Sequence, residues 1–175
     1  GSWRGGRGAM DARDYLRQLR DVHSAIVRMQ ERVEEHAEAL DMLRGALGDG
    51  MPRGSSDGKA LENAVVEHAE MMDAYTGELL RWTALRSQAL EVFERARAVL
   101  SDGAAHAIDP MWLDMCELHY LPPLMSYEGI RQRYRAGGMP IYGKTTVKWY
   151  CDRAVEWLGY SRGLDGMPLV PIVSE

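Results

Sequence analysis

The chain of 175 residues has two cysteines, a single phenylalanine and no long apolar run. The cysteines, Cys116 and Cys151, are too few for a disulfide framework, which favours a reducing, cytoplasmic compartment. No apolar stretch approaches the roughly 20 residues that span a bilayer, so no membrane partner is expected. The apolar residues are mainly Leu, Met, Ala and Val, which argues against a β-sandwich or a large α/β core. The composition therefore predicts an all-α fold.

Motifs for catalysis and for cofactor binding are also lacking. The segment before Thr145 (GGMPIYGK) contains Gly143-Lys144 but lacks the spacing of a phosphate-binding loop. No arrangement of histidine, carboxylate and nucleophile stands out, so neither an enzyme nor a cofactor is expected. Cys116 and His119 have a C-x-x-H spacing, but a zinc site needs four ligands and the sequence places no convincing fourth. We therefore expect no metal, a buried cysteine and a hydrogen-bonded histidine.

Charge is distributed unevenly along the chain, whose net charge is −5. Asp11–Leu100 contains 12 basic and 17 acidic residues, whereas Ser126–Arg162 contains 7 basic and 3 acidic residues, a net of +4. The total argues against a protein that coats nucleic acid over its whole surface. Only the C-terminal segment carries the positive charge that a DNA phosphate backbone attracts.

Two heptad seams organise residues 10–102. The first seam has apolar residues at alternating spacings of four and three, with one polar member, His36. Its members are Tyr15, Leu19, Val22, Ile26, Met29, Val33, His36, Leu40, Leu43 and Leu47. The second seam has the same spacing, with His68 and Arg86 as polar interruptions. Its members are Leu61, Val65, His68, Met72, Tyr75, Leu79, Trp82, Arg86, Ala89, Phe93, Ala96 and Leu100. Each seam predicts a long helix.

The stretch 45–59 between the seams is rich in Gly, Pro and Ser, which predicts a flexible loop that interrupts the helices. Two heptad helices joined by a loop bury their stripes most simply on each other, which predicts an antiparallel coiled-coil hairpin over 10–102. If Leu47 faces Leu61, partner numbers sum to about 108 and His36 lies near Met72. A two-helix hairpin buries little surface, so we expect it to pack on a second copy or on the C-terminal module.

The pattern changes after residue 102. Asp109 as N-cap and Pro110 at the first position predict a helix over 111–121, which stops at a pair of prolines. Ser126 is expected to cap a short helix over 127–136, ended by two glycines.

A linker over 138–143 then leads to a last helix over 144–158. Residues 163–175 are expected to form an extended tail. Residues 1–9 are expected to be a tag or disordered, with the natural start at Met10.

The short helix, turn and longer helix within 103–162 predict a helix-turn-helix DNA-binding domain. In such domains the first helix braces the duplex and the second enters the major groove. One face of the second helix is expected to be buried: Val147, Cys151, Ala154, Val155 and Leu158. The residues expected to bind DNA are basic, hydroxyl or aromatic: Lys144, Thr145, Thr146, Lys148, Trp149, Arg131, Arg133 and Arg135. Packing is the alternative role for Trp149.

Four short segments resemble those of a phage protein family: Met10–Leu19 (MDARDYLRQL), Gly50–Ser55 (GMPRGS), Leu118–Leu121 (LHYL) and Ser126–Ile130 (SYEGI). The family is similar to the RinA and ArpU type of phage late-gene transcriptional regulators. The resemblance implies an N-terminal coiled-coil hairpin followed by a small helix-turn-helix domain like sigma factor region 4.

Val147 and the pair Arg153-Ala154 also fit the spacing of the family's second helix. One feature departs from the family. Between Ile130 and Val147 the chain has about six residues more than a sigma-like turn, inserted somewhere in Arg133–Gly143.

The resemblance implies a sequence-specific transcriptional regulator of phage or prophage origin that binds promoter DNA in the cytoplasm of a bacterial host cell. The partner would be double-stranded DNA, and the hairpin would supply a homodimer contact or bind RNA polymerase. Two alternatives stay open: a phage DNA-packaging protein of the small-terminase type, and a helical adaptor that binds another protein through the acidic hairpin. A closed ring of many subunits would favour packaging.

Overall fold

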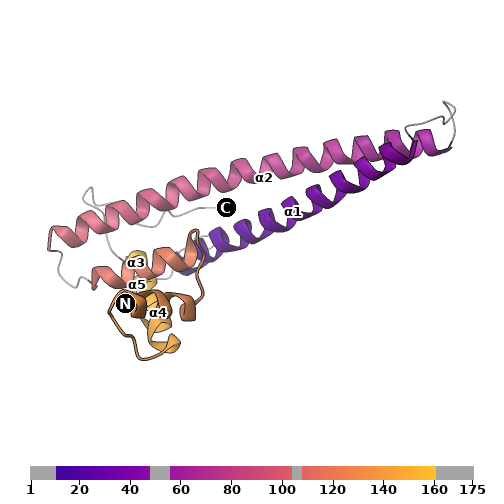
Figure 1. Cartoon of the computed structure of the whole chain (residues 1–175). Helices are drawn as coiled ribbons and strands as arrows, with labels where there is room; N and C mark the ends of the chain where they lie inside the picture. The colour runs from indigo at the N-terminus through magenta and orange to yellow at the C-terminus, as the bar shows by residue number, and fades with distance from the viewer. Residues whose placement is uncertain (1–10, 48–55, 104–107, 161–175) are drawn as a thin grey trace. The chain divides into compact units, whose positions relative to one another are not determined.

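The computed structural model describes residues 11–47, 56–103 and 108–160, and all regular structure within these ranges is helical. Five helices follow one another: α1 (Ala12–Leu47), α2 (Ser56–Ser101), α3 (Pro110–Tyr120), α4 (Tyr127–Ala136) and α5 (Lys144–Tyr160) (Figure 1). The predicted all-α class is confirmed. No helix in the described ranges is long and apolar enough to cross a membrane.

The expected tag (1–9), the expected tail (163–175) and the middle of the expected loop lie outside the described residues. The two ends of the loop expected over 45–59 are helical instead. Gly45 lies in the last turn of α1, and Gly58 lies in the first turn of α2. A glycine in a helix costs only about 1 kcal/mol relative to alanine, so packing of the long helices can offset it.

The chain divides into two compact units, and each long helix contributes to both. We call residues 22–83 the arm. We call the other unit, described over 11–21, 84–103 and 108–160, the C-terminal module. The boundary predicted from the sequence lies after residue 102. The module therefore includes the first turns of α1 and the last turns of α2.

Within the arm, α1 and α2 run antiparallel. The ring of His23 meets that of Trp82 edge-on at 5.2 Å between centroids, and the rings of His36 and His68 stack at 5.4 Å. Partner numbers thus sum to 105 and 104 rather than the expected 108. His36 lies against His68, one helical turn from Met72, a shift of about half a heptad.

The expected seam of α1 lies inside, since each described member is buried or half-buried. The expected seam of α2 differs at every second position as far as residue 86, whereas Ala89, Phe93 and Ala96 are buried as expected. Half-buried or buried positions in the arm portion of α2 recur at spacings of three and four: Leu61, Ala64, His68, Met71, Tyr75, Glu78 and Trp82. Val65, Met72 and Leu79, expected inside, are 40%, 38% and 38% exposed. The expected seam is therefore wrong by one residue at these positions, and α2 carries an apolar stripe on its outer side.

The core of the C-terminal module draws on all five helices. Its most deeply buried large side chains are Tyr15, Leu16 and Leu19 from α1, Phe93 from α2, Leu113, Met115 and Cys116 from α3, Ile130 from α4, and Val147, Cys151 and Leu158 from α5. The whole expected buried face of α5 is confirmed as buried. Gly159 makes the close approach of α5 to α1 feasible, because a β-carbon there would lie 3.3 Å from Cβ of Ala12.

Local hydrogen bonds place the shorter helices where the sequence predicts them. The Asp109 carboxylate accepts a bond of 2.9 Å from the backbone N–H of Met111, and Pro110 opens α3. The Ser126 hydroxyl oxygen accepts a bond of 3.0 Å from the backbone N–H of Gly129 and caps α4. Both caps satisfy donors that have no partner within the helix.

Candidate nucleic-acid interface

The seven residues between α4 and α5 form a turn that is tied to α4. The backbone N–H of Gly138 donates to the carbonyl of Arg135 at 3.1 Å, and that of Met139 donates to the carbonyl of Tyr134 at 2.9 Å. Gly138 has a φ of +87°, a region that favours glycine. The chain thus turns away from α4 immediately after its last residue.

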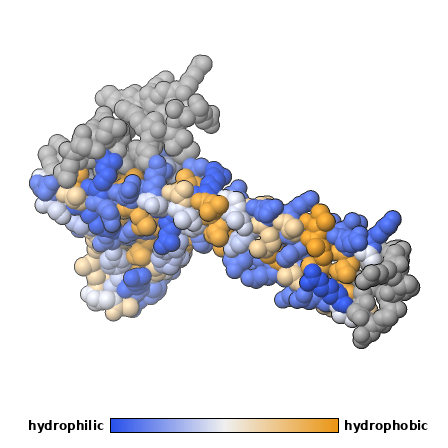
Figure 2. Space-filling model, turned by 90° about the horizontal axis from the view of Figure 1, so that it is seen from above, coloured by the Kyte–Doolittle hydropathy of each residue, from blue (hydrophilic) through white to orange (hydrophobic). Residues whose placement is uncertain are grey.

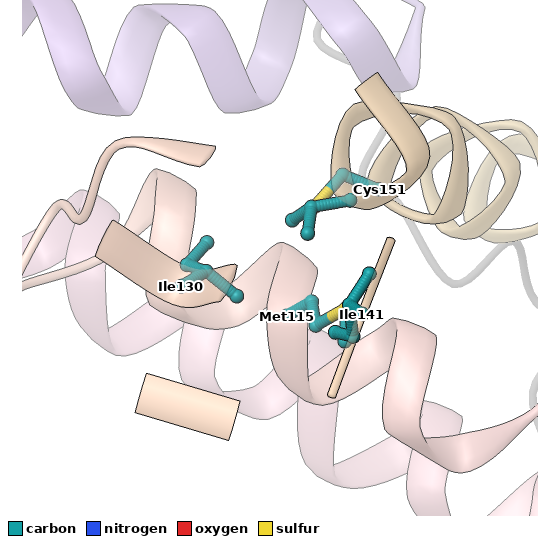
Figure 3. Packing of buried hydrophobic residues seen from close by; sticks show 5 residues of the cluster. Met115, Ile130, Ile141 and Cys151 are labelled. Atoms are coloured by element: carbon teal, nitrogen blue, oxygen red, sulfur yellow. The ribbon is translucent and has the colours of Figure 1, made fainter. Parts of the chain in front are cut away.

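Ile141 anchors the far end of this turn in the core. It packs in a cluster with Met115 of α3, Ile130 of α4 and Cys151 of α5, whose side chains point toward one another in Figure 3. Val147 completes this set of buried residues. The extra residues relative to a sigma-like turn therefore do not separate α4 from α5, because the two helices and the turn share one apolar cluster.

The N-terminal turns of α5 present polar side chains to solvent. Lys144, Thr145 and Lys148 are exposed, and Thr146 is half-buried. The first N–H groups of a helix lack partners within it, and the helix dipole is positive at this end. Cationic and hydroxyl side chains here add to a local environment that favours an anion such as a phosphate group.

Lys148 also takes part in a short chain of charges. Its Nζ lies 3.0 Å from a carboxylate oxygen of Asp152 one turn along α5, and the other oxygen of Asp152 lies 3.7 Å from the Arg13 guanidinium of α1. Asp152 is thus shared between two cations. The Lys148 side chain remains 55% exposed, so its ammonium stays accessible to a further anion.

Trp149 packs with one part of its ring and exposes the rest. Its ring meets those of Trp112 and Tyr150 edge-on, at 5.4 and 5.7 Å between centroids, and the Arg153 guanidinium lies 5.1 Å from its centroid. The residue is 49% exposed. The packing role is therefore present, and half of the surface remains available to a ligand.

The three arginines of α4 do not form one clamp. Arg131 donates to both carboxylate oxygens of Glu128, at 2.7 to 3.1 Å, and this hydrogen bonding lowers the pKa of Glu128 to about 2. Arg133 and Arg135 are exposed. Arg135 lies one turn from Arg131, whereas Arg133 lies on another side of the helix, close to the sulfur of Met125.

His119 of α3 links the segment before α4 to α1. Its Nδ1–H donates to the carbonyl of Met125 at 2.8 Å, and its Nε2 accepts from the Arg20 guanidinium at 2.8 Å. Its ring stacks on that of Tyr127 at 4.2 Å between centroids. Burial lowers the pKa of His119, and the Arg20 charge adds to this effect, against the raising effect of the Met125 carbonyl. Both ring nitrogens are therefore occupied in the neutral state.

Cys116 and Cys151 are fully buried, and neither forms a disulfide. Burial raises the pKa of the Cys151 thiol to about 12 and that of Cys116 well above its ordinary value, so both stay protonated at neutral pH. Within the described ranges, no three His, Cys, Asp or Glu side chains come together in a way that could hold a metal ion.

Two features of this surface lie outside the predicted set of DNA-binding residues. Tyr142, at the turn before α5, is fully exposed, and its neighbour Met139 is half-exposed. Arg153 joins the surface through its position over Trp149 and its ion pair with Glu156, at 3.1 Å. The helical period would have placed Arg153 beside Trp149, four residues earlier, but it gives no indication of the exposed tyrosine.

A scan against protein-family models finds no match for this chain, and comparisons with curated proteins and with solved structures also find none.

Proposed function

We propose that this chain is a sequence-specific DNA-binding transcriptional regulator of phage or prophage origin. It binds double-stranded promoter DNA through a helix-turn-helix formed by α4 and α5, with α5 in the major groove. The arm, as a coiled-coil hairpin, would join two copies or contact RNA polymerase. The resemblance of four short segments to phage late-gene regulators supports the transcriptional context.

The contrast between the two sides of α5 carries the proposal. One side is fully buried against α3 and α4, and the other presents Lys144, Thr145 and Lys148 within the first two turns. A helix that enters a major groove needs one buried side and one exposed side, because packing of the buried side determines which residues face the bases. The segment 126–162, with its net charge of +4, supplies the attraction to phosphate.

The test is DNA binding by Lys144→Ala/Lys148→Ala, measured by fluorescence anisotropy with a mixed-sequence duplex over a range of salt concentrations. We expect weaker binding on every sequence, and a plot of log Kd against log salt whose slope falls by about two.

The matched control is Arg28→Ala/Arg32→Ala, which removes two exposed cations at the same spacing from α1 in the arm. We expect this variant to bind DNA almost as well as the wild type. Equal losses in both variants would show that overall charge drives binding, and unchanged affinity in the lysine variant would refute the role of α5. No binding at low salt would favour the adaptor alternative, and a closed ring of many subunits would favour the packaging alternative.

A further inference from the structure

The arm buries few of its own side chains. Of its described residues, only Val22, Ile26, Leu40 and Trp82 are buried. Long helices draw most of their stability from tertiary packing of an apolar face, and a two-helix unit offers little such packing. In the space-filling view, apolar patches interrupt the hydrophilic surface along the arm (Figure 2).

The outer stripe of α2 is itself a heptad seam. Exposed residues recur along it at alternating spacings of three and four: Glu62, Val65, Ala69, Met72, Thr76, Leu79, Thr83 and Arg86. Large apolar residues alternate with small ones between the two charged ends. The Thr83 hydroxyl already donates to the carbonyl of Leu79, at 2.9 Å, so its methyl group can pack on an apolar neighbour.

This stripe is complementary to itself when two copies of α2 run antiparallel. With a two-fold axis midway between Met72 and Thr76, each large residue faces a small one of the other copy. The layers are Val65 with Thr83, Ala69 with Leu79, and Met72 with Thr76, each formed twice. Such alternation of large and small side chains lets two helices interdigitate closely.

Charge at the two ends of the stripe agrees with the same alignment. It places Glu62 of each copy opposite Arg86 of the other, and within the described residues neither has an ion-pair partner in the single chain. Val66 and Leu80, which are 57% and 67% exposed, lie beside the stripe and approach each other across the axis. We propose that the outer stripe of α2 joins two copies of this chain into an antiparallel dimer.

The dimer is tested by sedimentation velocity of the full chain over a wide range of protein concentration. We expect the wild type to sediment as a dimer and Met72→Glu as a monomer, because a carboxylate in the central layer would be buried against Thr76 of the other copy. The control is Met42→Glu, which alters a methionine on α1 that is 77% exposed and lies off the stripe, and it should leave the dimer intact. Circular dichroism checks that each variant keeps its helices. A monomeric wild type, or a dimeric Met72→Glu, would overturn the proposal.

Charge exchange tests the antiparallel alignment. Glu62→Arg should weaken the dimer about tenfold, because two ion pairs become two repulsive pairs, and adding Arg86→Glu should restore it. A parallel alignment would place Glu62 against Glu62 and predicts no such rescue. A double variant as weak as the single one would exclude the proposed register.

Discussion

His119 shows how one side chain can join segments that are far apart in sequence. Its Nδ1–H is bonded to the Met125 carbonyl before α4, and its Nε2 accepts from Arg20 of α1. This arrangement needs the neutral imidazole, since a proton on Nε2 would face the Arg20 guanidinium at 2.8 Å. The sequence predicts a hydrogen-bonded histidine here, but no local pattern points to Arg20, which lies 99 residues earlier.

We expect acidification to destabilise the C-terminal module through His119. Its pKa in the folded protein is lower than the ordinary value of 6.5. The unfolded chain therefore binds the proton more readily, and the contribution of His119 to stability is complete above pH 6.5 and is lost as the pH falls through the folded pKa.

Denaturant unfolding at pH 7.5 and 5.5, followed by tryptophan fluorescence, measures this effect. His119→Gln should reduce the difference in unfolding free energy between the two pH values, although it lowers stability at both. His23→Gln measures the part of the pH dependence that comes from a second histidine, in the arm, whose pKa burial also lowers. An undiminished pH dependence in His119→Gln would show that other groups cause it.

At the scale of elements, the turn between α4 and α5 depends on one apolar side chain. Ile141 is 8% exposed and packs among residues of α3, α4 and α5, while the adjacent Tyr142 is fully exposed. Since Ile141 alone ties the outer part of the turn to the core, it fixes where α5 begins.

Ile141→Ala should lower the free energy of unfolding by about 2 to 5 kcal/mol, the usual cost of a cavity left by a large aliphatic side chain. Tyr142→Ala should change it by less than about 0.5 kcal/mol, because the ring makes no buried contact. Urea denaturation of both variants provides the comparison. A loss for Ile141→Ala as small as that expected for Tyr142→Ala would mean that the turn is held by its backbone alone.

The elements also show what the sequence could and could not predict. The first and last residues of α4 are predicted correctly, because the cap at Ser126 and the stop at Gly137 are local signals. The inner seam of α2 is not a local property. Ala64 is half-buried while its more apolar neighbour Val65 is exposed, so a choice by hydrophobicity selects the wrong residue.

A helix with two apolar stripes contains no local signal that says which stripe faces its partner within the chain. The same limit applies to the candidate DNA-binding residues. The helical period correctly predicts which side of α5 is buried, but the bond between Arg131 and Glu128 is one of several arrangements that the sequence permits.

At the scale of the whole molecule, a dimer through α2 would carry two C-terminal modules. If both engage the same duplex, the second binding step becomes intramolecular, and overall affinity can exceed that of a single module by about a hundredfold or more. This expectation rests on the proposed DNA binding and on the proposed dimer together.

Met72→Glu separates these two proposals, because Met72 lies on the arm and outside the C-terminal module. We expect it to weaken binding to a long duplex by about a hundredfold. Binding to a short duplex, with room for one module only, should not change. Lys144→Ala/Lys148→Ala should weaken both. If Met72→Glu is monomeric yet binds the long duplex as the wild type does, the dimer exists without bivalent binding. Each module of the dimer would then hold its own DNA.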